Sequence, residues 1–596
     1  MKPIAKRSIA LLMLLCLLFC NVTPAMADDD DWYTYTYNYW GDPVASPNAY
    51  AVTNKIYPQY IDPELGTFSS ATSLFCIDDL VFICDAGNNR VIELQKVNGT
   101  YELVRIIYSL NVSKLVAPQL KFKDSIDATL YNPMDIFVKP ITQADRVANF
   151  GTDYLGDPYD FSAETASVTQ GNSLTTSDED NAGEGGEGGE SGEGGEGGEG
   201  GEDAPTPTPT PVAPSERKEN IVRKDLKRDY DFYIADKLHN RVIHCDYNLN
   251  VINVIRDPQD DTLGDNYVFN PEHIATDAAY RTYVQAAGVV NGFMEFDKGG
   301  SFTGYVGAAK VIVSFWRKLW RKIQTKEQRN RSAQHVPTEY NNISLDKNGF
   351  IYATISALED QDIWDGTATP VRKLNSMGTD ILIRNGSAFP MGDLSWGSVK
   401  NYAGASKFVD VIAFNNDTYC CLDRTRGKIF AYDFQGNLLY AFGNGGTTRG
   451  RFSQAVSMDN MDEETILVLD GTAGNITEFS MTDYGKMINE ALALYKTGYY
   501  DESAEVWKRI LQFNGNFELA YIGIGRALLR KGEYKEAMGY FESAHDSENY
   551  SKAFRHYREQ VVEKYIVYAV VVLIALIVIP KIIRKVRKMR KEIREA

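Results

Sequence analysis

The feature that most constrains the fold is a repeated hairpin pattern. The segments VFICDAGNNRVIEL at 81–94 and FYIADKLHNRVIHC at 232–245 align without a gap. In each copy an apolar strand ends in an aspartate, an asparagine follows four residues later, an arginine comes next, and a second strand begins. These residues are Asp85, Asn89 and Arg90 in the first copy and Asp236, Asn240 and Arg241 in the second. A single hairpin cannot bury its apolar face, so such repeats must stack on one another.

Two weaker copies extend the pattern towards the C-terminus. They are CCLDRTRGKIFAY at 420–432, with Asp423, Gly427 and Lys428, and LVLDGTAGNITEF at 467–479, with Asp470, Gly474 and Asn475. We expect the aspartate to accept hydrogen bonds from backbone amides, the Asn or Gly to take the left-handed conformation, and the cation to pair with the aspartate. These residues are therefore interpreted as structural.

The repeats resemble those of the NHL family of β-propellers, whose blades carry an aspartate, a turn and an Asn-X-Arg-like step between the second and third strands. The resemblance implies an all-β six-bladed propeller over 49–483, with seven blades as the alternative. The segment 49–57 would supply a strand that closes the ring. We place the blades near 68–110, 127–256, 268–307, 336–385, 401–443 and 449–483.

Two insertions interrupt the predicted ring. Residues 141–228 contain a Gly-Glu run and the stretch PTPTPTPVAP, and a composition of this kind cannot bury a core, so we expect a disordered segment inside the second blade. Residues 308–335 predict a basic amphipathic helix. It would either pack on the propeller rim or contact an anionic membrane or partner. Its possible interaction surface comprises Trp316, Arg317, Trp320 and Arg321.

A different period begins after the last blade. Three residues recur 34 positions apart with the same or similar chemistry: Gly498 with Gly532, Tyr500 with Tyr534, and Trp507 with Phe541. The spacing resembles that of tetratricopeptide (TPR) repeats, helical hairpins of about 34 residues. We therefore expect a small all-α, TPR-like module over 484–560, with these six residues in its packing.

The two ends of the chain predict export and anchoring. Residues 1–27 combine early cations, an apolar run and Ala25-Met26-Ala27, which is typical of a cleaved signal peptide. Residues 563–583 have the length and apolarity of a transmembrane helix, with 565–583 inside the membrane; a buried core helix is the alternative. The basic tail 584–596 would be cytoplasmic by the positive-inside rule. These features predict a single-pass protein of the cell membrane with its N-terminal ectodomain outside.

Composition limits the function further. The net charge is −18 although cations crowd both ends, so the ectodomain is acidic and is not expected to bind nucleic acid. Seven cysteines in 596 residues do not indicate a disulfide framework, and in an exported chain they favour a bacterial cell surface. The arm at 28–48 is rich in Tyr and Trp. It could be an ordered edge strand, or its aromatic rings could stack on sugars or anchor a protein.

No motif predicts catalytic, cofactor-binding or metal-binding residues: the six histidines form no ligand spacing, and no nucleophile stands beside a base. We therefore expect a non-enzymatic interaction scaffold without a cofactor. The resemblance implies an accessory of a carbohydrate import system, with a membrane transporter subunit or a glycan as the partner. The alternative is a metal-dependent propeller hydrolase of the lactonase type. A signalling role is disfavoured by the short tail.

Overall fold

The computed structural model describes residues 34–112, 127–141, 218–258, 267–307, 339–355, 369–384, 390–395 and 404–595, with a few single positions between them. The chain is a six-bladed β-propeller followed by an all-α region, as the sequence predicted, and that region has five helices. It divides into two compact units, 61–289 with 293–305, and 1–60 with 290–292 and 306–596. The predicted signal peptide and the helical insertion at 308–335 lie outside the described residues.

The first unit contains three antiparallel blades. The first is β4 (Ala71–Ile77), β5 (Leu80–Asp85), β6 (Arg90–Val97) and β7 (Thr100–Ile107). The second is β9 (Pro133–Pro140), β11 (Tyr230–Asp236), β12 (Arg241–Asp246) and β13 (Asn250–Ile255), with β8 (Asn111–Val112) parallel to β13. The third is β14 (Pro271–Thr276), β15 (Thr282–Ala286), β16 (Phe293–Phe296) and β17 (Phe302–Val306).

The second unit contains the other three blades. The fourth is β18 (Asn342–Leu345), β19 (Ile351–Thr354) and β20 (Val371–Leu374). The fifth is β23 (Phe408–Ala413), β24 (Tyr419–Asp423), β25 (Lys428–Tyr432) and β26 (Leu438–Phe442). The sixth is β29 (Ala455–Asn460), β30 (Thr465–Asp470) and β31 (Asn475–Met481), and β3 (Tyr50–Ile56) is its outermost strand. The shorter elements are α2 (Pro58–Ile61), β21 (Leu394–Ser395), β22 (Gly404–Ala405), β27 (Asn444–Gly445) and β28 (Arg451–Phe452).

Two aspartates on innermost strands tie neighbouring blades together. Asp135 of β9 accepts a hydrogen bond from the Ser73 hydroxyl of the first blade and one, at 2.9 Å, from the Ile274 amide of the third. In the other unit, Asp410 of β23 accepts from the Asn342 side chain of the fourth blade. Its second oxygen accepts from the Met458 amide of the sixth, at 2.7 Å. A buried carboxylate thus joins three consecutive blades in each unit.

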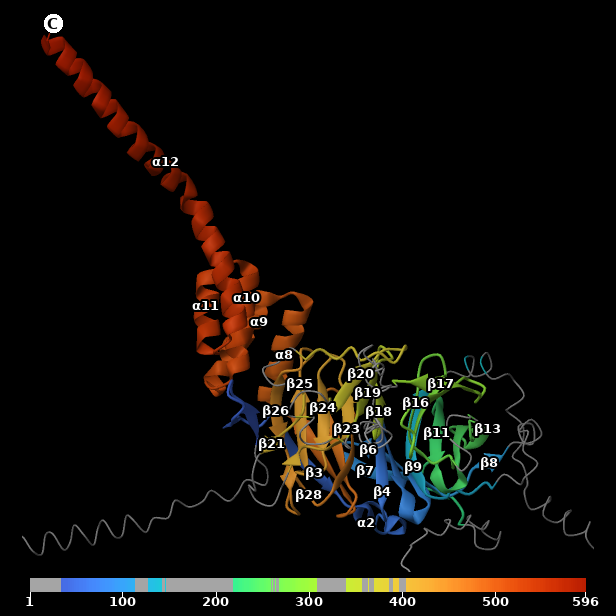
Figure 1. Cartoon of the computed structure of the whole chain (residues 1–596). Coiled ribbons are helices and arrows are strands. Elements are labelled where there is room, and N and C mark those ends of the chain that lie inside the picture. The colour runs from blue at the N-terminus through green and yellow to red at the C-terminus, as the bar shows by residue number, and fades with distance from the viewer. Residues whose placement is uncertain are drawn as a thin grey trace, which may run out of the picture. The chain divides into compact units, whose positions relative to one another are not determined.

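The five helices follow the sixth blade without a break. They are α8 (Asp483–Thr497), α9 (Tyr500–Phe513), α10 (Glu518–Lys531), α11 (Tyr534–Ser543) and α12 (Ser547–Glu595). Each helix packs against the next, and Figure 1 shows α12 continuing far past the others. Gly498 and Gly532 end α8 and α10 in the left-handed conformation, with φ of 92° and 88°, which glycine adopts without strain. Helix α12 is the one described helix long and apolar enough to cross a membrane.

The predicted disordered insertion is wrong at its C-terminal end. From residue 218 the chain is ordered, and β10 (Ile221–Val222) pairs antiparallel with β7 of the first blade. The Asn220 side chain accepts from the amides of Tyr108 and Ser109, at 2.7 and 3.0 Å. Composition obscured this strand because its contacts are with a blade more than a hundred residues earlier. The remainder of the insertion, apart from Ile141 and two single positions, lies outside the described residues.

Candidate functional site

The candidate site is built around the N-terminal arm. Residues Tyr35–Tyr37 form β1 and Pro43–Ala45 form β2, and the two strands make a hairpin. Strand β1 also pairs with β26 through Tyr35 and Ala441, so the arm extends the fifth blade to six strands. The tip of the hairpin carries Tyr39 and Trp40.

A partly buried carboxylate fastens this hairpin to the blade. Asp393 accepts hydrogen bonds from the hydroxyls of Tyr35, at 2.7 Å, and Tyr37 on one oxygen. Its other oxygen lies 3.1 Å from Lys428 Nζ and 3.7 Å from Arg426 Nε. Burial alone raises the pKa of Asp393, but the Lys428 charge and the hydrogen bonds from Tyr37 and Tyr35 outweigh burial and leave that pKa below its ordinary value. The carboxylate is therefore charged and fully engaged near neutral pH.

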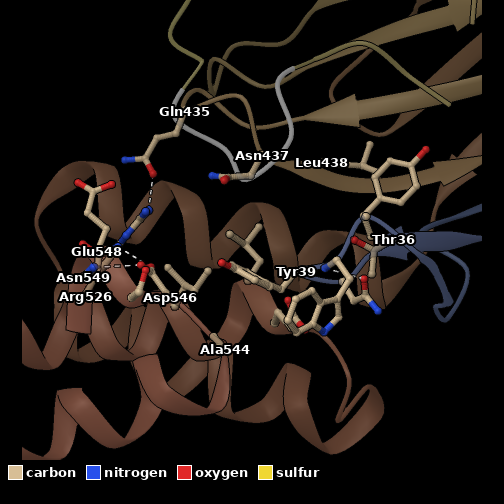
Figure 2. A pocket seen from close by; sticks show the side chains of 18 of the residues that line it. Thr36, Tyr39, Gln435, Asn437, Leu438, Arg526, Ala544, Asp546, Glu548 and Asn549 are labelled. Atoms are coloured by element: carbon tan, nitrogen blue, oxygen red, sulfur yellow. Dashed lines mark hydrogen bonds between the residues drawn. The ribbon is translucent and has the colours of Figure 1, made fainter. Parts of the chain in front are cut away.

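The hairpin forms one wall of a pocket of about 690 Å³. The fifth blade contributes the turn between β25 and β26, and the helices contribute one face of α10, the α11–α12 loop and the first turns of α12. Figure 2 shows Gln435, Asn437 and Leu438 facing the cavity from the blade, opposite Arg526 and Asp546 from the helices, with Tyr39 between them. The volume falls within the roughly 300–1,000 Å³ of small-molecule sites.

Charges in the pocket are balanced and mostly partnered. Three cations and three anions line it: Arg384, Arg526, Lys552, Glu518, Asp546 and Glu548. Lys552 pairs with Glu548 at 2.6 Å, and Arg526 donates to the Gln435 side chain (Figure 2). Burial raises the pKa of Glu518, although the Tyr39 amide and His545 oppose the shift. The lining therefore carries no net formal charge and presents donors and acceptors on several sides.

The left-handed turn positions behave alike in the two strong repeats. Asn89 and Asn240 have φ of 54° and 52°. Arg90 Nε donates to Asp85 at 2.7 Å, and Arg241 Nε donates to Asp236 at 2.8 Å.

The backbone amides that donate hydrogen bonds to these aspartates come from outside the turn. Asp85 accepts from the Ser69 amide at 2.7 Å and Asp236 from the Tyr131 amide at 2.8 Å, each in the segment leading into the innermost strand. The carboxylate therefore joins the hairpin to the start of its own blade, a long-range contact that the local pattern does not reveal.

The weaker repeats depart from the pattern at the cation. Lys428 was predicted to pair with Asp423, but Arg426 does so, with Nη1 3.4 Å from the carboxylate. Lys428 is instead bound to Asp393. We call the cluster of Asp393, Lys428, Tyr35 and Tyr37, which holds the N-terminal arm on the blade, the latch. Asp470 accepts hydrogen bonds from the Ser453 amide, at 2.7 Å, in the segment before β29, and from the Ala473 amide, at 2.9 Å, in its own turn.

The residues predicted for helix packing lie in the helical region. Trp507 and Phe541 are buried, Tyr500 packs against the same core, and the Tyr534 ring stacks on His556 at 5.3 Å. The possible surface of Trp316, Arg317, Trp320 and Arg321 lies outside the described residues. Five cysteines of the described ranges are buried, namely Cys76, Cys84, Cys245, Cys420 and Cys421. Within the described ranges, no group of three or more His, Cys, Asp or Glu side chains is placed to hold a metal ion.

The pocket itself was not predicted. Only the aromatic arm had been singled out, because the blade turn and the helix faces carry no motif. The sequence signal that could have marked it is the Tyr39-Trp40 pair followed by Gly41, since aromatic residues at a glycine turn lie on a connecting segment, where binding residues concentrate.

No protein-family model matches the chain, and no curated protein is similar to it in sequence. Solved structures with a similar arrangement include virginiamycin B lyase from Staphylococcus aureus, at 8% identity and a TM-score of 0.34, covering 73% of this chain and 100% of that chain. YCF48 from Cyanidioschyzon merolae is 10% identical with a TM-score of 0.32, covering 72% of this chain and 99% of that one.

A third similar structure is the extracellular domain of a protein described as a hybrid two-component system from B. thetaiotaomicron. It is 10% identical with a TM-score of 0.30, covering 74% of this chain and 43% of that chain. Likeness at this level does not transfer activity, ligand or partner.

Proposed function

We propose that this protein is a membrane-anchored extracytoplasmic scaffold that binds a protein or a glycan in the pocket between the N-terminal arm, the fifth blade and the helices. The observation that carries the proposal is the course of α12. Its first turns line the pocket with Ser547, Glu548, Asn549 and Lys552, and the same helix contains the apolar segment 565–583. A binding site and a membrane-length segment thus share one continuous helix.

The helix also sets the height of the pocket above a membrane. Lys552 and Tyr565 are 13 residues apart in α12, which at 1.5 Å per residue is about 20 Å. A pocket at that height is within reach of the extracytoplasmic loops of a neighbouring membrane protein. This geometry supports a transporter subunit, or a glycan on its way to one, as the partner, as in the carbohydrate import role that the NHL-type resemblance implies.

The proposal includes the finer identity of the parts. The propeller would be of the NHL type, the helices would form tetratricopeptide repeats, and the basic tail would lie in the bacterial cytoplasm. Support comes from the left-handed Asn89 and Asn240 turns and from the buried Trp507 and Phe541, which stand 34 residues apart. Protease shaving of intact cells tests the topology, because an exported ectodomain is digested and a cytoplasmic one is spared.

Site-specific crosslinking tests the binding role. A photo-reactive residue replaces Asn437 in the full-length chain in native membranes, and the control replaces Phe513, a 64% exposed residue of α9 that does not line the pocket. We expect a membrane transporter subunit, or a species that shifts on glycosidase treatment, only from position 437. Recovery of the same abundant proteins from both positions would contradict the proposal.

A further inference from the structure

The tip of the N-terminal hairpin presents an aromatic ring that its fold does not need. The indole of Trp40 is 71% exposed, and it meets the ring of Tyr39 edge-on with centroids 5.0 Å apart. His545 lies beside both rings, with centroids 5.9 Å from Tyr39 and 6.0 Å from Trp40. An exposed tryptophan held by two neighbouring rings leaves an apolar surface that water covers poorly.

The tip is also rigid before any ligand arrives. The Asn38 side-chain oxygen accepts from the amides of Trp40 and Asp42, both at 2.9 Å. The Gly41 amide donates to the Asn38 carbonyl at 3.0 Å, with φ of 80° at Gly41. The latch on Asp393 fixes the strands behind this turn. A ligand that stacks on Trp40 therefore loses little affinity to ordering of the protein.

The rest of the lining determines what kind of ligand suits this ring. Cations and anions are equal in number, which disfavours a strongly charged ligand such as a phosphate or a polyamine. Four side-chain amides lie among the charges, and each has one group engaged within the protein. The oxygens of Asn38 and Gln435 accept internal bonds, so these residues offer their NH₂ groups. The NH₂ groups of Asn437 and Asn549 donate to aspartates, so these residues offer their oxygens. Amide groups that donate or accept, together with carboxylate oxygens that accept, suit hydroxyl groups, which do both.

We infer that the pocket binds a neutral carbohydrate, with the apolar face of a pyranose ring on Trp40 and its hydroxyls on the surrounding amides and on Glu518. In this arrangement the face of the indole contacts the axial C–H groups of the pyranose, and polar side chains at the edge of the pocket bond its equatorial oxygens. This inference rests on the proposed function, since it names the ligand class of the same pocket, and it selects the glycan over the protein.

The test uses the full-length chain in a zwitterionic detergent, because a detergent with a sugar headgroup would compete for the site. The probes are neutral oligosaccharides, namely malto-, xylo-, cello-, manno- and galacto-hexaoses, with their uronic-acid counterparts as charged controls. Binding is measured by calorimetry and by the change in tryptophan fluorescence. We expect at least one neutral series to bind and the charged series to bind more weakly.

Variants locate the binding. Trp40→Ala should weaken it about tenfold, the loss of one stacked ring, whereas Trp40→Phe should retain most of the affinity. Phe513→Ala, an exposed aromatic outside the pocket, is the matched control and should bind as the unmodified chain does. Because Trp40 is so exposed, neither substitution should shift the thermal midpoint.

Three results overturn the inference: no neutral probe binds, only charged probes bind, or binding is the same in Trp40→Ala. None of these bears on the scaffold proposal, which the crosslink from position 437 tests separately. If that crosslink captures a transporter subunit while no glycan binds, the scaffold stands, the partner is a protein and the carbohydrate assignment is wrong. If glycan binding depends on Trp40 and no protein is captured, both the scaffold proposal and the assignment of a carbohydrate ligand are supported.

Discussion

Replacement of Asp393 by asparagine tests how the N-terminal arm is held. The substitution keeps the size of the side chain but removes the charge that faces Lys428 and Arg426. The Tyr35 and Tyr37 hydroxyls also point at this carboxylate, so four donors converge on it. The amide NH₂ of asparagine adds a further donor where only acceptors are needed. At least one buried donor or cation is left without an acceptor.

The size of the effect follows from burial. The side chain of Asp393 is 15% exposed and that of Lys428 is 17% exposed, so water replaces the lost interactions only in part. Loss of a charged hydrogen-bond partner at such a site costs about 2–3 kcal/mol, below the full cost of breaking a completely buried pair. That free energy corresponds to an increase of about 30- to 150-fold in the opening of the arm.

Hydrogen exchange read by mass spectrometry measures this opening. Peptides covering 35–45 should exchange faster by that factor in Asp393→Asn, while peptides from β29–β31 stay unchanged. The control is Glu464→Gln, which removes a surface pair with Lys486 whose side chains are 52% and 45% exposed. Such pairs contribute little, so the control should match the parent protein. Unchanged exchange of 35–45 in Asp393→Asn would refute the latch.

Three further outcomes are expected. The pKa of Asp393 in the folded protein lies below its unfolded value of about 3.9, so the latch is complete above about pH 3.9 and is lost as the pH falls through the folded pKa. Hydrogen exchange of 35–45 should therefore rise only as the pH falls through the folded pKa. Asp135→Ala should lower the urea midpoint by the equivalent of about 2–3 kcal/mol, unlike Asp297→Ala, whose carboxylate caps its own turn. Trp507→Ala, at a 2% exposed site, should destabilise α8–α11 by about 3–5 kcal/mol in chemical denaturation.

The propeller could be predicted from the sequence because its evidence is local and repeated. Each hairpin carries its own turn chemistry, so Asp85, Asn89 and Arg90 can be recognised within six residues, and repetition implies stacking. The period of 34 residues likewise implied paired helices, and the length of the apolar segment at the C-terminus implied a helix that can cross a membrane. Patterns of this kind can be recognised without knowledge of the tertiary structure.

The site could not be predicted in the same way, because its parts meet only after folding. Trp40, Asn437 and Lys552 come from three regions separated by more than a hundred residues, and no local pattern links them. The same limit explains the error at Lys428. In sequence it occupies the cation position of a repeat, but Asp393, from the segment before the fifth blade, and Tyr35, from the arm, lie beside its ammonium group. Arg426 takes its place beside Asp423. Local periodicity therefore determined the blades and helices, whereas long-range packing decided which polar side chains meet and where a cavity remains.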